Sequence, residues 1–559
     1  MDSKNLIGKV QSVDTGNVII HVDHEDLLNS VQVNQIVQIT STKVGETIIG
    51  LVSKIMRRAI ADNIGDDEVP DCTTENVVRI NLVGTLIEKV GERKNVFKRT
   101  LNTVPSIDAE CFLLKDDELS SFMNVISGDT LNPLRIGTYT ISENSVANLD
   151  GNKFFQRHAV IVGGTGSGKS WTVANLLEKA SKLQSVNCLV FDLHGEYKPL
   201  KDLQNTVLLK IAGPSDSPND NGVIFLPYWL LSYEEMEALL LDRSDSNAPN
   251  QARVLFDLII KCKQSTLIDE KKQDVLDNFT VESPIPYQIS NVLRELENLD
   301  NEMVQGAKGE KQGPLNGKLT RFIQRLKSKE SDKRLNFLFN SSDKLSDYDW
   351  FSTLAETIMD FGNKKGIKII DFSEVPSDIL PLITGLIGRL VFSLQQWMEE
   401  NKRQPIALFC DEAHLYLPET INAGIEERGL YNFERIAKEG RKYGIALVVI
   451  SQRPSDVNKT ILSQCGNFIA MRLTNPDDQN VIQRLFPDNL GNFAEMLPIL
   501  DVGEALIVGD ASLLPSRVIV DKPFIKPNSA TIDFWDEWGK TKIDKGITQA
   551  VISLRRQHK

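Results

Sequence analysis

The sequence predicts an α/β protein with an all-β barrel at its N-terminus and a helical subdomain inserted into its core. Short alternating apolar runs fill about the first 145 residues, strand-like and helical stretches alternate from about residue 155, and a polar, helix-patterned stretch interrupts them. At 559 residues the chain is also too long for a single core. We place the barrel at residues 1–145, the core at 146–232 and 351–525, the helical insertion at 233–350 and a C-terminal tail at 526–559.

The barrel is predicted from alternation with a period of two. The apolar bursts NVIIHV, QIVQIT, TIIGLV and NVVRINLVGTLI are separated by Gly, Asp and Asn. Strands of this kind bury one face each, and many short strands separated by turn residues are typical of a small closed sheet.

The core is predicted from four apolar runs that are short enough to be buried strands: HAVIVGG, NCLVFDLHG, PIALFCDEAH and IALVVISQRP. Because helical stretches separate them, we expect a parallel sheet covered on both faces. KIIDFSEV predicts a further strand, and SDILPLITGLIGRLVFSLQQWMEEN predicts a core helix with Ser377 at its N-cap.

The insertion is polar and mostly helical in pattern, and GAKGEKQGPLNG predicts one exposed loop within it. The segment KLTRFIQRLKSKESDKR is strongly basic. A solvated helix face is the favoured interpretation, and a contact with nucleic acid or a partner is the alternative.

Composition limits the class of protein. Hydrophobic residues make up 41% and charged residues 25%, as in a globular chain, and no apolar run approaches the length of a membrane span. MDSKNLIGKV lacks the apolar centre of a signal peptide, so we expect a cytoplasmic protein without membrane segments. The 6 cysteines are scattered, which predicts reduced thiols. The net charge of −13 argues against a surface that coats nucleic acid, although it allows a local basic channel.

GGTGSGKS matches the phosphate-loop pattern in full, and it lies between an apolar strand and a helix. Its glycines allow main-chain N–H groups to surround a phosphate at a helix N-terminus. Lys169 would reach the β- and γ-phosphates of ATP, and the hydroxyl of Ser170 would contact Mg²⁺. The predicted nucleotide contacts are Gly163, Gly164, Thr165, Gly166, Ser167, Gly168, Lys169, Ser170 and Trp171.

An ATPase of this type also needs a carboxylate for the metal and a second one that activates water. PIALFCDEAH supplies both, with Asp411 acting through the water shell of the metal and Glu412 as the general base. The alternative is a buried strand that ends in two acids at a turn. An adjacent acidic pair favours hydrolysis over mere switching.

Polar residues end two further strands. Gln452 could hydrogen-bond the γ-phosphate or the attacking water, and thereby sense which nucleotide is bound. Asp192 and Glu196 would lie at the carboxyl edge of the sheet, or they cap a turn there. His194 and His414 are interpreted as satisfied turn or core residues.

An arginine from a neighbouring subunit commonly neutralises charge on the transferred phosphoryl group. Arg435 and Arg441 are the two candidates, and we favour Arg441 because it directly precedes the buried strand IALVVI. The alternative for Arg441 is a surface ion pair, worth about 0–1 kcal/mol.

The ordered set FQRHAVIVGGTGSGKS, DLHGEY, FCDEAH, KEGRKYGIALVVISQRPSDV and MRLTNPDDQNVIQR closely resembles the HerA branch of the HerA/FtsK translocases. The resemblance implies a RecA-like P-loop ATPase core and a homohexameric ring that moves double-stranded DNA through a central pore. It also implies a protein partner, either a nuclease or a Sir2-like effector, in DNA-end processing or antiviral defence. Carried over to this chain, it assigns the phosphate loop, Asp411, Glu412, Gln452 and Arg441 the roles given above, and it places Arg472 near the nucleotide or the subunit interface.

Two functions of different classes remain at this point. The first is an ATP-driven DNA translocase that works with an effector. The second is a hexameric scaffold that bound nucleotide orders, and that arrays and activates a partner enzyme without processive movement on DNA.

Overall fold

The computed structural model describes residues 5–23, 25–61, 72–88, 95–127, 132–306, 309–362, 365–421, 424–487, 491–529, 532–541 and 546–557. The chain divides into two compact units. Unit 1 consists of residues 1–179, 451–455 and 462–524, and unit 2 consists of residues 180–450, 456–461 and 525–559. Among the described helices, none has both the length and the apolar character needed to cross a bilayer.

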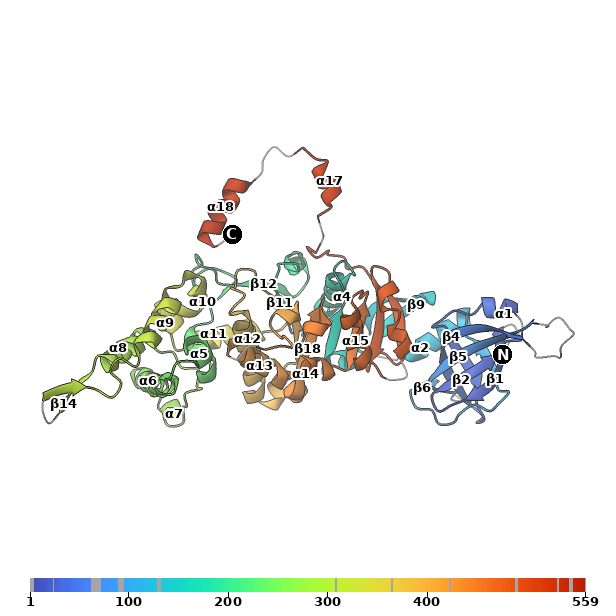
Figure 1. The fold of residues 1–559 in the computed structure, drawn as a ribbon, viewed down its shortest axis with the longest axis horizontal. Coiled ribbons are helices and arrows are strands. Elements are labelled where there is room, and N and C mark those ends of the chain that lie inside the picture. Colours follow the sequence, from blue (N-terminus) through green and yellow to red (C-terminus); the bar gives the residue numbers. More distant parts are fainter. Residues whose placement is uncertain are drawn as a thin grey trace. The chain divides into compact units, whose positions relative to one another are not determined.

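Unit 1 begins with a closed antiparallel barrel (Figure 1). Each strand pairs with two neighbours in the cyclic order β1-β2-β5-β4-β3-β7, and β6 extends β5 at one edge. The strands are β1 (Leu6–Val13), β2 (Asn17–His21), β3 (Ile36–Thr40), β4 (Glu46–Ala61), β5 (Cys72–Ile87), β6 (Val96–Lys98) and β7 (Glu110–Leu113), with helices α1 (Glu25–Asn29) and α2 (Asp116–Ser127). Closure leaves the six barrel strands without a free edge, and it confirms the predicted all-β barrel.

The barrel core follows from the alternation seen in the sequence. In β2, for example, Val18 and Ile20 are buried while their neighbours are partly exposed. One apolar cluster fills the interior, and it includes Val10, Ile39 and Ile80 from three different strands. Arg99, just after β6, donates to the main-chain oxygens of Gly509, Ser512 and Leu513, which fixes the barrel to the sheet of unit 1.

The sheet of unit 1 is mixed. Its strand order is β10-β19-β20-β21-β8-β9, in which β10 and β19 are parallel and the later pairs are antiparallel. The strands are β8 (Leu134–Tyr139), β9 (Ser142–Leu149), β10 (Ala159–Val162), β19 (Asn467–Met471), β20 (Glu504–Gly509) and β21 (Ser516–Val520). Its helices are α3 (Gly151–Gln156), α4 (Lys169–Ser181), α15 (Pro476–Leu485) and α16 (Gly491–Ala494), of which α4 continues into unit 2.

The sheet of unit 2 is parallel throughout, in the order β13-β12-β16-β11-β17-β18. The strands are β11 (Cys188–Asp192), β12 (Thr206–Ile211), β13 (Val223–Ile224), β16 (Ile367–Asp371), β17 (Ile406–Cys410) and β18 (Ile445–Ser451). Every residue of β11, β16, β17 and β18 is buried, as expected for strands covered on both faces. The predicted α/β core is thus confirmed, with antiparallel strands in unit 1 that the sequence did not predict.

Two helices of unit 2, α12 (Leu380–Trp397) and α13 (Ile425–Glu439), cross at very short range. A Cβ atom at Gly385 would lie only 2.5 Å from Cα of Gly429, so the paired glycines permit this crossing. The prediction of Ser377 as the N-cap of α12 is wrong, because Ile379 occupies that position. Pro381 lies in the first turn of α12, where its missing N–H costs nothing, and so fixes the start of the helix.

The insertion is helical, with α5 (Tyr233–Leu240), α6 (Ala248–Asp269), α7 (Gln273–Leu276), α8 (Ile289–Asp300), α9 (Thr320–Ser331), α10 (Asn336–Phe339) and α11 (Trp350–Met359). The expected exposed loop is partly a hairpin of β14 (Met303–Gly306) and β15 (Gly309–Gln312). The basic helix α9 buries an apolar face, and Arg325 pairs with Asp242 at 2.9 Å. These contacts favour the solvated-face interpretation of its charges.

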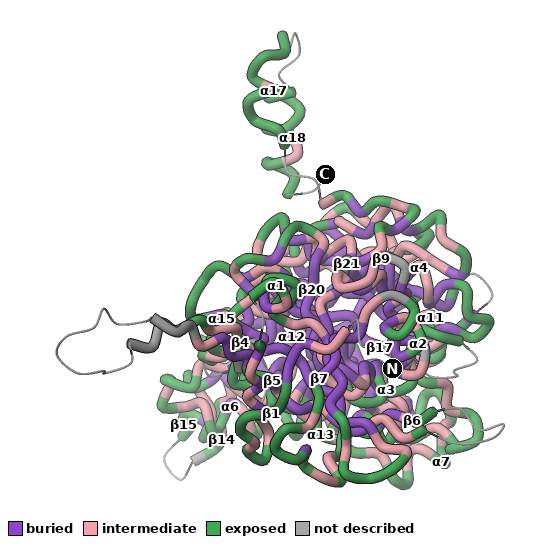
Figure 2. Tube along the Cα trace, turned by 90° about the vertical axis from the view of Figure 1, so that its right-hand side faces the viewer, coloured by how far each residue is buried: buried purple, intermediate pink, exposed green. Residues whose placement is uncertain are grey.

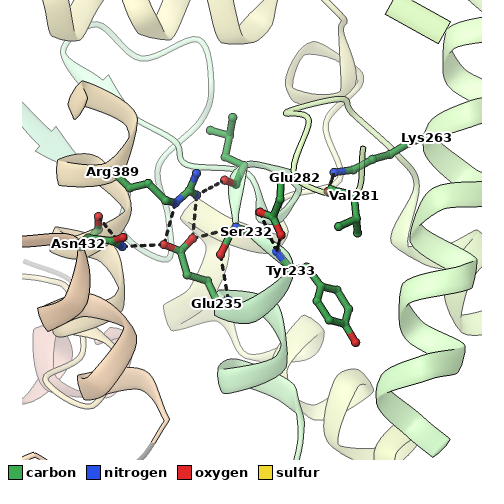
Figure 3. A network of polar contacts seen from close by, with 10 residues as sticks. Ser232, Tyr233, Glu235, Lys263, Val281, Glu282, Arg389 and Asn432 are labelled. Atoms are coloured by element: carbon green, nitrogen blue, oxygen red, sulfur yellow. Dashed lines mark hydrogen bonds and ion pairs between the residues drawn. The ribbon is translucent and has the colours of Figure 1, made fainter. Parts of the chain in front are cut away.

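A buried ion pair attaches the insertion to the core of unit 2 (Figure 3). Glu235 in α5 accepts hydrogen bonds from Arg389 in α12, at 2.9 and 2.8 Å, and from Asn432 in α13, at 3.0 Å. The same carboxylate completes a capping box with Ser232 at the start of α5. Its side chain is 2% exposed, and these donors compensate its desolvation.

The chain ends in a tail that carries α17 (Phe534–Trp538) and α18 (Ile547–Arg556). Neither helix has a buried residue, and Figure 2 shows both as mostly exposed with some intermediate residues. A short helix of the core, α14 (Lys459–Ser463), lies between β18 and β19 along the chain.

Candidate nucleotide-binding and hydrolysis site

The phosphate loop connects β10 to α4 in unit 1. All four residues of β10 are buried, so the loop begins from a fixed point in the sheet. Gly166 and Gly168 have φ angles of 74° and 107°, a region in which side chains other than glycine are strained. The loop conformation therefore requires the glycines that the motif supplies.

The inner side of the loop is tightly packed, and its outer side is open. A Cβ atom at Gly163 would lie 2.4 Å from Oγ of Ser167 and 2.9 Å from Cβ of Met471. At Gly166, by contrast, an added Cβ would meet no atom within 4 Å. The loop is thus held from behind by β19, while space remains in front of it.

The main-chain N–H groups of the loop fall into two sets. Those of Gly163, Gly164 and Ser167 donate to oxygens of the protein. Within the described residues, those of Thr165, Gly166, Gly168 and Ser170 form no hydrogen bond. Unused donors at the N-terminus of a 13-residue helix are a ready anion site, so this loop fits a phosphate group.

Lysine and hydroxyl groups flank these donors. Lys169 opens α4 and is 8% exposed, and Ser170 follows it and is partly buried. Trp171 is also partly buried. The lysine therefore supplies a positive charge at the same helix end as the unused N–H groups.

Gln452 reaches the phosphate loop. It directly follows β18, and its Oε1 accepts a hydrogen bond of 2.9 Å from the hydroxyl of Thr165. The main chain reinforces this contact, because N–H of Gly163 donates to the carbonyl of Ser451 at 3.4 Å. The structure thus places the predicted sensor against the loop, while its contact with Thr165 was not predicted.

The acidic pair ends β17 in unit 2. Asp411 and Glu412 are 3% and 6% exposed. Glu412 has φ and ψ of 44° each, a left-handed conformation that is unusual for a residue with a side chain. Strained backbone of this kind, costing about 1–3 kcal/mol, clusters at functional sites.

The pair lies among other buried polar groups of unit 2. Burial raises the pKa of Tyr197 well above its usual value, and the negative charges of Asp411 and Glu196 add to this effect. Burial also raises the pKa of Tyr416. The acidic turn therefore has a desolvated floor, in which electrostatic interactions are stronger than in water.

Asp192 has a structural role in this region. Its carboxylate accepts the N–H groups of Glu196 and Tyr197, at 2.9 Å each, and so forms the turn that follows β11. Burial raises its pKa to about 6, against the opposing effect of these hydrogen bonds. These contacts match the turn-capping interpretation of Asp192.

The two candidate arginines differ in their surroundings. Arg435 stacks on Phe392, with 4.3 Å from its guanidinium carbon to the ring centre, and hydrogen-bonds Gln396 at 3.4 Å. Arg441 is exposed, and its side chain forms no hydrogen bond or ion pair within the described residues. Arg472 touches the phosphate loop through its carbonyl, which accepts N–H of Gly164 at 2.8 Å.

His414 was interpreted from the sequence as a satisfied turn or core residue. In the structure its Nδ1 lies 3.3 Å from Oε2 of Glu412. Only its position two residues after the predicted base could have suggested this contact from the sequence. The contact itself depends on the conformation of the turn between the two residues.

Two family models cover most of the chain. The model of the HerA helicase central domain matches residues 134–391, and that of the HerA-like helicase C-terminal domain matches residues 389–541. The chain belongs to the HerA family. It is accordingly an ATPase with a P-loop core, as the motifs predicted.

Individual HerA relatives agree with the family assignment. The DNA double-strand break repair helicase HerA of Saccharolobus solfataricus is 30% identical over 442 residues, which cover 78% of this chain and 77% of that protein. The protein of the same name from Sulfolobus acidocaldarius is 28% identical and covers 77% and 76%. Among solved structures, the bacterial conjugative coupling protein TrwB matches with a TM-score of 0.45 and 13% identity, over 74% of this chain and 93% of that one.

Proposed function

We propose that the chain is a motor that moves along double-stranded DNA at the expense of ATP, and that it acts as a homohexameric ring. The observation that carries the proposal is the phosphate loop with unused N–H donors, hydrogen-bonded to the polar residue that ends β18. β17 pairs along its whole length with β18, and the acidic pair directly follows β17. Relatives named DNA repair helicases support DNA as the track.

The phosphate loop binds the triphosphate in this proposal. The unused N–H groups at the start of α4 surround the phosphates, and Lys169 adds a positive charge on the β- and γ-phosphates. The hydroxyl of Ser170 and, through water, the carboxylate of Asp411 would hold Mg²⁺. Bound there, the ion would supply positive charge to the same phosphates, a role that needs few protein ligands.

Hydrolysis uses the residues at the ends of β17 and β18. Glu412 accepts a proton from the attacking water, and Gln452 contacts the γ-phosphate or that water. Because Gln452 also contacts Thr165, arrival of a phosphate at the loop changes the partners of Gln452. The contact between Thr165 and Gln452 thereby distinguishes a bound triphosphate from a bound diphosphate.

Arg441 acts on the nucleotide of a neighbouring subunit. An arginine that acts on another subunit must point outward. Arg441 is exposed, and its side chain forms no hydrogen bond or ion pair within the described residues. Arg435, by contrast, is held on α12 by Phe392 and Gln396 of its own chain. These contacts favour Arg441 over Arg435.

DNA binding by such a ring is local and electrostatic. A net charge of −13 argues against a surface that binds DNA throughout, so the grip comes from a limited set of basic groups. An effector of the nuclease or Sir2-like class is the proposed protein partner, and its processing of DNA is coupled to the motor.

The experiment compares the full-length chain with Lys169→Ala and Glu412→Gln in ATP binding, DNA-stimulated phosphate release and displacement of a third strand from duplex DNA. We expect Lys169→Ala to lose binding of a non-hydrolysable ATP analogue. Glu412→Gln should retain binding and lose at least about 100-fold in phosphate release, the magnitude typical of a general base. Both variants should fail to displace the third strand.

Glu400→Gln, which alters an exposed carboxylate of unit 2, is the matched control and should behave as the unaltered chain. Strand displacement by Glu412→Gln at the normal rate would overturn the motor. The scaffold would be favoured if Glu412→Gln fully activated a partner enzyme while neither the unaltered chain nor any variant displaced the third strand.

A further inference from the structure

The turn after β17 brings an imidazole against the proposed base. Nδ1 of His414 lies 3.3 Å from Oε2 of Glu412, and the two side chains are only 12% and 9% exposed. Because both side chains are mostly buried, water competes little for this contact. The two atoms are within ion-pair distance, but their geometry is not that of a hydrogen bond, as is common for catalytic contacts that tighten only when substrate binds.

The backbone forces the two side chains together. Glu412 is left-handed, and a one-turn 3₁₀ helix, Ala413–Leu415, starts directly after it. N–H of Leu415 donates to the carbonyl of Glu412 at 2.9 Å, and N–H of Leu417 donates to that of Ala413 at 2.7 Å. The left-handed conformation of Glu412 turns the chain back on itself. The side chain of His414, two positions later, therefore lies next to that of Glu412.

The turn is held on its far side as well. N–H of Asn458 donates to the carbonyl of Leu417, and N–H of Glu419 donates to that of Asp456, at 2.9 Å each. Beneath it, the ring of Tyr416 packs against Phe433, with centres 6.0 Å apart. A turn fixed on both sides keeps the imidazole in one place despite the strained residue.

A general base must direct one oxygen at one water, yet a glutamate side chain has three rotatable bonds. A donor on the other carboxylate oxygen removes that freedom in advance. An imidazole protonated on Nδ1 supplies such a donor in the plane of its ring, whether its charge is zero or positive.

We propose that His414 is a positioning residue for Glu412, which holds Oε2 through Nδ1 so that the other carboxylate oxygen faces the attacking water. The inference rests on the proposed role of Glu412 as the base. It gives the last residue of the FCDEAH motif a role in hydrolysis in place of the structural one expected from the sequence.

Three substitutions of His414 in the full-length chain separate positioning from packing. Asn places an amide nitrogen where Nδ1 lies, Gln places one where Nε2 lies, and Ala places none. We expect His414→Ala and His414→Gln to lower kcat for ATP about 10- to 100-fold, as misplaced catalytic groups do. His414→Asn should retain most of kcat, and all three should bind a non-hydrolysable ATP analogue as the unaltered chain does.

A second background tests the link to Glu412. In Glu412→Gln chains, His414→Ala should cause no further loss of kcat, because the group it positions is already inactive. Equal kcat for the Asn, Gln and Ala variants, whether normal or reduced, would overturn the positioning role. Normal phosphate release by Glu412→Gln would instead overturn the proposed base, and the two failures are thus distinguishable.

Discussion

Thr165 and Gln452 show how a single hydroxyl can connect two parts of the proposed hydrolytic site. The Thr165 hydroxyl donates to Oε1 of Gln452 at 2.9 Å, and the bond lies in an exposed part of unit 1. Because water competes there, the bond stabilises this arrangement by only about 1 kcal/mol. A phosphate group can therefore take over either partner at small cost, which suits a sensor.

Replacing Thr165 with Val removes the hydroxyl and keeps the shape. We expect kcat for ATP to fall about 3- to 10-fold, because Gln452 loses a contact of about 1 kcal/mol that orients it. Thr165→Ser keeps the hydroxyl and is the matched control, with kcat near that of the unaltered chain. Steady-state phosphate release measures both, and a Val variant as active as the Ser variant would show that the hydroxyl orients nothing.

At this scale the sequence predicted residue types better than contacts. The phosphate loop was recognisable because its spacing of glycines, Lys169 and Ser170 is a requirement of the chemistry. The contact of His414 with Glu412 was not predictable, since it depends on a left-handed turn that no residue type there demands. Ser377 failed as a cap because Pro381 decides where α12 begins.

At the scale of elements, buried strands were the most predictable feature. β10, β11, β17 and β18 lie within the four apolar runs, because a strand covered on both faces needs continuous apolar sequence. The antiparallel addition of β20, β21, β8 and β9 was missed, because pairing of segments far apart in the sequence, such as Tyr139 with Val518, leaves no local signal. The attachment of α5 to α12 and α13 is equally non-local.

That attachment gives a prediction for the insertion. Arg389→Met leaves the buried carboxylate of Glu235 without its charged partner, and breaking such a pair costs about 3–5 kcal/mol. We expect faster hydrogen exchange of the amides of α5 in this variant, measured by mass spectrometry on the full chain. The double variant Arg389→Met with Glu235→Met removes both charges and should regain most of the protection.

An exposed ion pair of the same insertion serves as the control. Lys261 lies 3.8 Å from Glu295, and its side chain is 68% exposed, so Lys261→Met should leave exchange in α5 unchanged. Slow exchange of α5 in the Arg389→Met chain would mean that apolar packing, and not the ion pair, holds the insertion.

At the scale of the whole molecule, the proposed motor needs a hydrolytic site to which two chains contribute residues. α13 ends at Glu439, and the chain then passes through Arg441 before it enters the fully buried β18. Arg441 is thus carried by a rigid element, although its own side chain is uncommitted within the described residues. This combination suits a group that completes the site of another copy.

Mixing two inactive chains tests this arrangement. A Lys169→Ala chain retains Arg441, and an Arg441→Ala chain retains Lys169, so a ring that contains both can form a complete site where the second chain meets the arginine of the first. With random assembly in equal amounts, about a quarter of the sites have both groups, whereas none would if Arg441 served its own chain. We therefore expect phosphate release to rise from near zero to at most about a quarter of the unaltered rate on mixing.

Arg435 provides the matched control for that mixture. Its stacking on Phe392 and its bond to Gln396 assign it to packing within its own subunit, so Arg435→Ala alone should keep most of the ATPase activity. Native mass spectrometry of the mixture verifies that both chains enter the same rings. In every mixed ring, at least one chain that retains Lys169 receives the arginine of a neighbour that retains Arg441. If mixed rings form and phosphate release stays at the level of the separate variants, Arg441 therefore does not act across subunits.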